Sequence, residues 1–394
     1  MSSSIKFHWI AIVAVIGVLN CNSTLLGQGK GKGKNGGGGG GNGGTATYSI
    51  IPFVPSGFDS GYANDLNEMG QAVGEANIAA GQPGQAVHFD IASGTYTLLE
   101  SGAYPASTAF DVNDQNQIVG AMANGSSDTV GVFWSSPTAA PTLLPPLPGD
   151  AHSRATGLNH TGLVVGESMS STFDVRRGVV WRVSVAVNGT VQVNAPVELP
   201  LPVGGIGSRI AAITEGYDGS AVVAGTTYYQ DAVQEATIWM LSVNPDSTFF
   251  VAGVEGLGSL DGAFSEANGA NIFGDVAGSS GSANGSTPVI APLGQDFQPL
   301  ATPRNATGAN AQDVNDLGDI VGPVYFWKRQ WALPRGFAYL WQDGEPTDLL
   351  QRVSNGSNWD RLSSAWAINN AGIIAGGGYL DGEGNGFLLI PNSN

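Results

Sequence analysis

Cysteine is nearly absent from this chain, and histidine is scarce. Cys21 is the only cysteine, and it lies in an N-terminal segment that we expect to be removed on export, so the mature protein can form no disulfide. Three histidines would remain, namely His88, His152 and His160, and they are not paired at the spacing of a zinc site. We therefore predict no metal and no cofactor, and we interpret His88 as a histidine packed on a strand.

Charged residues are also few, and basic ones are fewer than acidic ones. The 394 residues include 32 Asp and Glu against 15 Lys and Arg, which gives a net charge of −17. A nucleic-acid-binding protein would have a basic patch, and docking on anionic lipid would need clustered Lys and Arg. The acidity therefore argues against both partner classes, and it is typical of a protein that its charge keeps soluble.

Long apolar runs are absent except at residues 10–19. This run is too short for a membrane-spanning helix, which needs about 20 residues, and it fits the core of a signal peptide. We predict a signal peptide over residues 1–27, cleaved between Asn20 and Gln28, a secreted or cell-envelope location, and no membrane span. Lipidation at Cys21 is the less favoured alternative, because Asn20 stands where a small residue is expected. Residues 28–44, rich in Gly and Lys, predict a flexible linker.

A short phrase recurs seven times in the rest of the chain. Most copies open with Asn, carry Gly or Asn three positions later, and close on Gly after an apolar pair. The copies cover residues 67–74, 113–120, 159–166, 218–225, 271–278, 315–322 and 369–376, of which the fourth, opening at Asp218, is the most divergent. A period of roughly 40–50 residues indicates a repeat architecture.

Each copy is best interpreted as the corner of a β-hairpin. Alternating residues before the Asn, as in 109–113, indicate a strand, and Asn and Gly tolerate the positive φ of a tight turn. The apolar pair opens a second strand, a third strand follows, and a fourth apolar segment ends the unit. The third strand often ends in Trp, as at Trp134, Trp181, Trp239 and Trp341. Four strands per unit, repeated seven times, predict an all-β fold, a seven-bladed β-propeller over residues 45–394.

The two ends of this region complement each other. The seventh copy stops after its third strand, whereas an unassigned strand at residues 47–53 precedes the first copy. We expect this strand to supply the missing fourth strand of the last blade. The termini would then be fastened together with no open sheet edge.

These phrases resemble the bacterial extracellular HAF-repeat family, named for a His-Ala-Phe tripeptide. The resemblance covers essentially all of residues 45–394, and the family's Ala-x-x-Ile-Asn-Asn-x-Gly-x-Ile-Val-Gly phrase is matched best by 365–376 and 311–322. The tripeptide is degraded here: its last two positions survive in 336–337 and 386–387, but Arg335 and Asn385 stand where the family has His. The resemblance implies export and a propeller-like fold, and it implies no catalytic residues.

Calcium binding and common hydrolase chemistry find little support. The stretch beginning at Asp313 resembles the start of a calcium loop, but Leu317 and Val324 occupy positions that require oxygen ligands. No Gly-x-Ser-x-Gly element occurs, nor does any Asp-box of the sialidase type. Carboxylate pairs for glycoside cleavage stay open, because Asp and Glu are plentiful.

The strongest binding candidate is an aromatic and basic insertion between the second and third strands of the sixth unit. It contributes Trp327, Lys328, Arg329, Trp331 and Arg335. The connection before the last copy adds Trp359 and Arg361, and in an up-and-down blade the two kinds of loop emerge on one face. Trp and Arg favour recognition by stacking on sugars or clamping acidic groups. The competing interpretation is that the Trp side chains pack between blades.

The sequence thus predicts an exported, non-catalytic binding or scaffold protein, most simply a monomer, for an envelope polysaccharide or a cell-surface protein. One alternative is a propeller enzyme, a hydrolase or lyase acting on polysaccharide. It would need carboxylates, Tyr or Arg converging at the central funnel. A second alternative is a structural surface-layer component.

Overall fold

A computed structural model describes residues 47–392 except 80–81, 125–127, 215–219, 245–247, 263, 283–284, 329–332, 355 and 357. The predicted signal peptide, Cys21 and the linker lie outside the described residues, as do Arg329 and Trp331 of the candidate binding insertion. Within the described residues, no helix has the length and apolar character needed to span a membrane.

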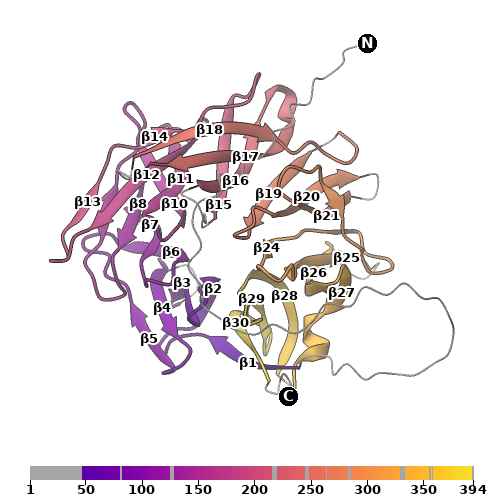
Figure 1. The fold of residues 1–394 in the computed structure, drawn as a ribbon. Coiled ribbons are helices and arrows are strands. Elements are labelled where there is room, and N and C mark those ends of the chain that lie inside the picture. Colours follow the sequence, from indigo (N-terminus) through magenta and orange to yellow (C-terminus); the bar gives the residue numbers. More distant parts are fainter. Residues whose placement is uncertain are drawn as a thin grey trace, which may run out of the picture. The chain divides into compact units, whose positions relative to one another are not determined.

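Seven antiparallel sheets are arranged in a ring, which confirms the seven-bladed β-propeller (Figure 1). The first blade comprises β2 (Ser60–Leu66), β3 (Gln71–Asn77), β4 (Gln85–Asp90) and β5 (Thr95–Leu98). The second comprises β6 (Ala106–Val112), β7 (Ile118–Asn124), β8 (Asp128–Trp134) and β9 (Thr142–Leu144). The third comprises β10 (His152–Leu158), β11 (Leu163–Met169), β12 (Arg176–Val185), β13 (Val191–Val193) and β14 (Val197–Glu198). Both β13 and β14 pair with β12.

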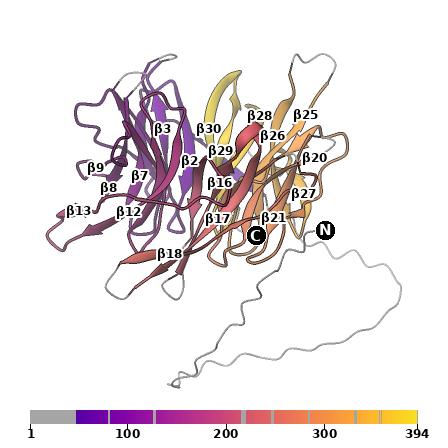
Figure 2. The same ribbon diagram turned by 90° about the horizontal axis from the view of Figure 1, so that it is seen from above.

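The fourth blade comprises β15 (Gly207–Ile213), β16 (Ser220–Tyr228), β17 (Gln234–Val243) and β18 (Phe249–Gly256). The fifth comprises β19 (Ser265–Ala270), β20 (Val276–Ser282), β21 (Gly285–Ala291) and β22 (Gln298–Pro299). The sixth comprises β23 (Gly308–Ala309), β24 (Asp313–Val314), β25 (Ile320–Phe326), β26 (Arg335–Gln342) and β27 (Glu345–Asp348). The seventh comprises β28 (Trp359–Ile368), β29 (Ile374–Leu380), β30 (Glu383–Pro391) and β1 (Tyr48–Phe53). Two short 3-10 turns, Gln230–Ala232 and Leu349–Arg352, complete the described elements. Figure 2 shows the strands of neighbouring blades from the side of the ring.

The repeated phrase forms the turn between the first and second strands of a blade, as predicted. In the first blade, Oδ1 of Asn67 accepts hydrogen bonds from the backbone N–H groups of Met69 and Gln71 at 3.1 and 2.9 Å, and Gly70 has a φ of 76°. A Cβ on the closing Gly74 would overlap the carbonyl oxygen of Tyr62. The Asn and the first Gly therefore shape the turn, and the closing Gly permits close strand contact.

In the fourth blade, the predicted alignment of the repeated phrase on Asp218 is wrong. Thr214, not Asp218, occupies the position of the repeat Asn: its N–H donates to the carbonyl of Val222, and its Oγ1 accepts from the N–H of Val222. Asp218 lies outside the described residues. The turn is longer in this blade, so the position is shifted in the sequence.

The repeat Asn also joins neighbouring blades. Its side-chain amide donates to the backbone carbonyl of the equivalent residue in the next blade. This bond runs from Asn67 to Asn113 at 3.0 Å, from Asn159 to Thr214 at 3.3 Å, from Asn271 to Asn315 at 3.2 Å and from Asn315 to Asn369 at 3.0 Å. One residue type thus shapes the turn and holds the ring together.

The third-strand Trp side chains fill the space between blades, as expected. Trp134, Trp181, Trp239 and Trp341 are fully buried, and each Nε1–H donates to a backbone carbonyl of the connection before its own blade at 2.7–2.8 Å. The apolar core is accordingly divided into clusters, each combining residues of two neighbouring blades. His88 is buried as predicted, with Nε2 at 3.1 Å from Oδ1 of Asn116.

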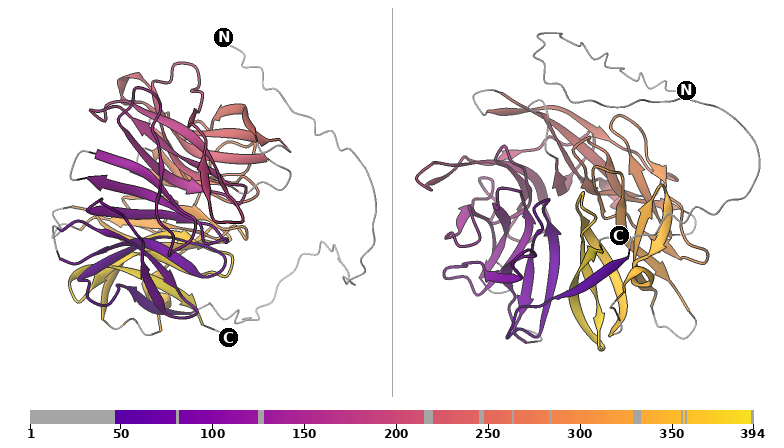
Figure 3. Two further views of the ribbon diagram at one scale, coloured as in Figure 1. Left: turned by 90° about the vertical axis from the view of Figure 1, so that its left-hand side faces the viewer. Right: turned by 60° about the horizontal axis from the view of Figure 1, so that its bottom comes forward.

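The N-terminal strand β1 is the fourth strand of the seventh blade (Figure 3). It pairs antiparallel with β30, from Tyr48 opposite Pro391 to Phe53 opposite Gly386. The buried ring of Phe53 packs against Phe89 and Tyr96 of the first blade, with ring centroids 6.2 and 5.6 Å apart. This strand therefore contacts the last and the first blades at once.

Candidate functional site

The innermost strands surround a channel that contains a cavity of about 550 Å³. The residue three positions before the repeat Asn, or before Thr214 in the fourth blade, lines this cavity in all seven blades. These residues are Asn64, Phe110, Thr156, Ala211, Asn268, Gln312 and Trp366. Their chemical variety contrasts with the uniform turns, so the repeat holds different side chains around one space.

A β-bulge places these side chains. The register of the first two strands shifts between Ala63 and Asp65, and Asn64 between them has no partner across the pair. The same shift occurs in five further blades, around residues 110, 156, 211, 268 and 366. In the sixth blade, Gln312 lies in the interruption between β23 and β24. A bulge bends the strand and redirects the extra residue, which here faces the channel.

Charged side chains gather at the part of the cavity farthest from the repeat turns. It is lined by Arg154, Arg209 and Glu266, each five positions before the repeat Asn of its blade, or before Thr214 in the fourth blade. Glu167 on β11 also lines it and is nearly fully buried, with Oε2 at 3.5 Å from Nη1 of Arg176. This cluster brings three guanidinium groups close to one buried carboxylate.

The Arg154 guanidinium is poorly compensated in its buried position. It lies 4.0 Å from the ring centroid of Phe110, and its Nε is buried without a hydrogen-bond partner in the described part of the chain. Burial lowers the pKa of Arg154, although the charge of Glu167 works against this shift. Burial likewise raises the pKa of Glu167, and the charges of Arg154, Arg176 and Arg209 oppose that rise.

Three carboxyl groups form the floor of the cavity, toward the repeat turns. Asp65, Asp111 and Asp313 accept backbone N–H bonds from the next blade at 3.1, 2.7 and 2.9 Å. Burial and the neighbouring Asp111 raise the pKa of Asp65 well above its usual range, and the two side chains hydrogen-bond to each other. Burial also raises the pKa of Asp313, to about 6. Each group therefore has a structural role between blades.

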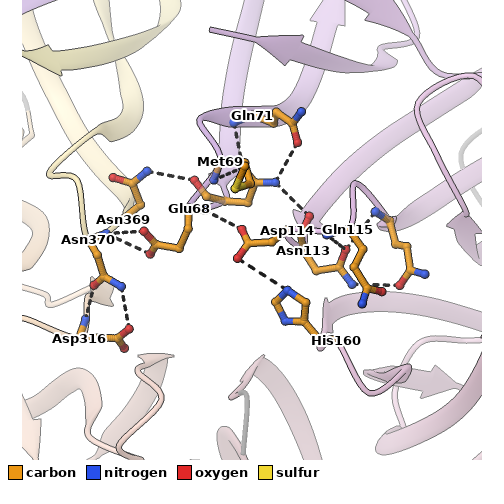
Figure 4. A network of polar contacts seen from close by, with 12 residues as sticks. Glu68, Met69, Gln71, Asn113, Asp114, Gln115, His160, Asp316, Asn369 and Asn370 are labelled. Atoms are coloured by element: carbon orange, nitrogen blue, oxygen red, sulfur yellow. Dashed lines mark hydrogen bonds and ion pairs between the residues drawn. The ribbon is translucent and has the colours of Figure 1, made fainter. Parts of the chain in front are cut away.

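The channel's other end, at the repeat turns, is rimmed mainly by acidic and amide groups (Figure 4). The N–H of Glu68 donates to Asp114 at 2.9 Å, that of Asn370 to Glu68 at 3.0 Å, and that of Asp316 to Asn370 at 2.8 Å. His160 Nε2 lies 3.7 Å from Oδ2 of Asp114. The two ends of the channel thus differ in their basic groups: Arg154 and Arg209 lie at one end together with Glu167 and Glu266, whereas the other end carries carboxylates and amides without arginine among the residues that line it.

The sequence-predicted insertion contributes to a separate groove on the sixth blade. Trp327 is half exposed and, with Lys328, Phe326, Phe337, Tyr339 and Arg304, lines a space of about 480 Å³. Arg335 begins β26, opposite Phe326. Arg361 lies beside this groove, with its guanidinium 5.8 Å from the ring centroid of Phe337.

Trp359 does not belong to this surface. Its indole is 7% exposed and packs edge-on against Phe387, with ring centroids 5.8 Å apart. The sequence predicted Trp359 in a connection, whereas β28 begins at this residue, and its side chain is buried. We therefore leave Trp359 out of the candidate site.

The cavity residues were not predicted from the sequence. The predicted site lay in the irregular loops, but the cavity is lined from within the repeated strand, three and five positions before the repeat Asn. Aligning the copies on that Asn would have exposed Arg154 and Glu266 as non-repeated charges at one repeated position. An alignment of the seven copies could therefore have predicted these charged residues as site candidates.

Comparisons with known proteins identify similar folds but no family. Neither a family model nor a curated protein sequence matches the chain. Among solved structures, an ulvan lyase of polysaccharide lyase family PL25 is similar at 10% identity and a TM-score of 0.45, over 88% of this chain and 96% of that chain. Virginiamycin B lyase from Staphylococcus aureus is similar at 10% identity and a TM-score of 0.45, over 88% and 99%. A prolyl endopeptidase is similar at 8% identity and a TM-score of 0.49, over 88% and 51%. These likenesses concern the fold alone.

Proposed function

We propose that this chain is an exported carbohydrate-binding protein whose central cavity holds an acidic sugar. The observation that carries the proposal is the convergence of Arg154 and Arg209 on a single cavity, with Arg176 beside them, in a chain of net charge −17. Guanidinium groups match the planar, two-oxygen geometry of carboxylates and suit sulfate as well. Export follows from the sequence interpretation of residues 1–27.

The rest of the cavity wall suits a sugar ring. Trp366 provides an aromatic surface, and Phe110 a second one on which the Arg154 guanidinium lies. Asn64, Asn268 and Gln312 add amide groups, of which Asn64 and Asn268 each also donate to a backbone carbonyl of the next blade, at 2.8 and 2.9 Å. Binding pockets for small molecules commonly measure about 300–1,000 Å³ and combine apolar walls with a few placed polar groups. The floor carboxyls would repel an anion, so the acid group of the ligand should face the arginines.

Calorimetry with galacturonate and glucuronate, against galactose and glucose, tests this proposal. We expect the uronates to bind and the neutral sugars to bind at least about tenfold more weakly. The double variant R154A/R209A should lose uronate binding. R182A is the matched control, because Arg182 does not line the cavity and instead donates to the carbonyl of Thr161 in the repeat turn of the third blade. Equal affinities for acidic and neutral sugars, or unchanged binding by R154A/R209A, would refute the proposal.

An enzyme acting on an acidic polysaccharide is the second candidate. A propeller enzyme of this kind needs carboxylate, Tyr or Arg groups that converge at the central funnel, and Glu167 with its neighbouring arginines meets that requirement in part. Tyr228 is near the same charges: burial raises its pKa, and the positive charge of Arg209 opposes that rise. Buried ionisable groups with shifted pKa values are common in catalytic sites. Release of unsaturated or reducing ends from acidic polysaccharides would support this candidate over simple binding.

A surface-layer component, the third possibility from the sequence, has a separate test. Self-assembly of the purified protein into ordered arrays without any saccharide would favour it.

A further inference from the structure

A line of aromatic and arginine side chains connects the sixth-blade groove with the central cavity. Its members come from the sixth, seventh and first blades, and all except the cavity residue Trp366 lie toward the strand ends opposite the repeat turns. They are Trp327, Phe337, Arg361, Tyr379, Tyr62 and Trp366, called here the aromatic track. Three of them are well exposed: Trp327 at 53%, Tyr379 at 41% and Tyr62 at 36%.

Arg361 makes the link between the sixth and seventh blades. Its guanidinium lies 5.8 Å from the ring centroid of Phe337, which lines the groove, and 4.5 Å from that of Tyr379. Its Nε is buried and has no hydrogen-bond partner among the residues that the structure describes. The guanidinium is thus held by two aromatic faces, as a cation–π pair requires.

Tyr62 makes the link between the seventh blade and the channel. Tyr379 pairs across the sheet with Gly384, and a Cβ on Gly384 would lie only 3.2 Å from Oη of Tyr62. The glycine thereby leaves room for the Tyr62 side chain beside the seventh blade. The Tyr62 ring lies 6.3 Å from that of Trp366, which lines the cavity.

We propose that the aromatic track binds successive units of an acidic polysaccharide whose bound sugar occupies the cavity. This inference rests on the proposed function and extends it from a single sugar to a polymer. Exposed Tyr and Trp rings stack on sugar faces at low entropic cost, and Arg361 supplies positive charge for the acid groups between them. Further contacts on one chain raise the affinity by adding sites at high effective concentration.

Oligogalacturonides from the monomer to the octamer, titrated calorimetrically into the full chain, test the track. For the wild type we expect the affinity to rise with length by about tenfold or more before it levels off. Y379A and W327A should abolish most of this rise and leave binding of the monomer unchanged. R361K keeps the charge and loses the planar stacking, so it should reduce the rise in part. F250A removes an exposed aromatic of β18 outside the track and should behave as wild type.

The outcomes separate the two proposals. Monomer binding without any gain from length, or a gain that survives Y379A and W327A, overturns the track and leaves the cavity proposal standing. Absence of binding for every acidic oligomer overturns both. Melting curves of each variant show whether it is folded, and W327A provides a second test of the track if Y379A does not fold.

Discussion

The side-chain amide of Asn369 donates a hydrogen bond of 3.0 Å to the backbone carbonyl of Asn67. This contact joins the last blade to the first across 302 residues of sequence. It is the same bond that Asn67, Asn159, Asn271 and Asn315 make to the next blade, so the ring closes with its own repeated contact. The pairing of β1 with β30 closes it a second time, at the outer edge.

Loss of the inner closure should be measurable. Asn369→Ala removes the bond to Asn67 and the acceptor for the N–H of Ile373, both in a buried turn. Leaving buried backbone groups unpaired costs about 1–3 kcal/mol each, so we expect the free energy of unfolding to fall by about 2–4 kcal/mol. Urea denaturation followed by Trp fluorescence gives the value. Asn188→Ala, in an exposed turn where Asn188 accepts one bond from Thr190, should cost far less.

Loss of the outer closure should be larger. Phe53→Ala empties a fully buried position between the last and first blades, against Phe89 and Tyr96. Buried Phe→Ala changes cost about 3–5 kcal/mol, and the same denaturation experiment should show a loss of that size. Phe250→Ala, at an exposed aromatic, is the matched control. Similar small losses in both variants would mean that β1 is not a stable part of the last blade.

The sequence predicted those parts of the molecule that depend on period and local chemistry. The turn at Asn67 follows from the preference of Asn and Gly for tight turns. The burial of Trp181 follows from the space that a large side chain fills between neighbouring sheets, and the number of blades follows from the number of repeats. The cavity does not, because strict alternation along a strand cannot reveal the bulge that points Asn64 or Phe110 into the channel. Trp359 was misplaced for a related reason: where β28 begins depends on its pairing with Leu380, a residue of another strand.

The floor carboxyl of Asp313 should make stability depend on pH. Burial raises its pKa to about 6, above the value of 3.8 for an ordinary Asp, so the native state holds the proton more tightly than the unfolded chain. This contribution is fully present below pH 3.8 and is lost as pH rises through about 6. Asp313→Asn keeps an oxygen acceptor for the N–H of Ile368 and cannot ionise. We expect the variant to exceed the wild type in stability by about 1–3 kcal/mol above pH 6, with little difference near pH 4.

Urea denaturation across this pH range, with Asp59→Asn as an exposed control, measures the effect. A variant that is less stable than the wild type at neutral pH would show instead that the native carboxylate is ionised and stabilising.

Glu167 offers the sharpest separation of a binding protein from an enzyme. Its carboxylate competes with any anionic ligand for Arg154, Arg176 and Arg209, because it lies among their guanidinium groups. For a binding protein, Glu167→Gln should therefore tighten uronate binding, by about threefold to tenfold, since a nearby negative charge is removed. For an enzyme that uses this carboxylate as acid or base, the same variant should keep or improve binding and lose product formation by at least about a hundredfold.

Calorimetry and a product assay on the same preparations decide between a binding protein and an enzyme, with Glu198→Gln, exposed on β14, as the control. Weaker uronate binding by a folded Glu167→Gln variant would show that the carboxylate orients the arginines and does not compete with the ligand for them.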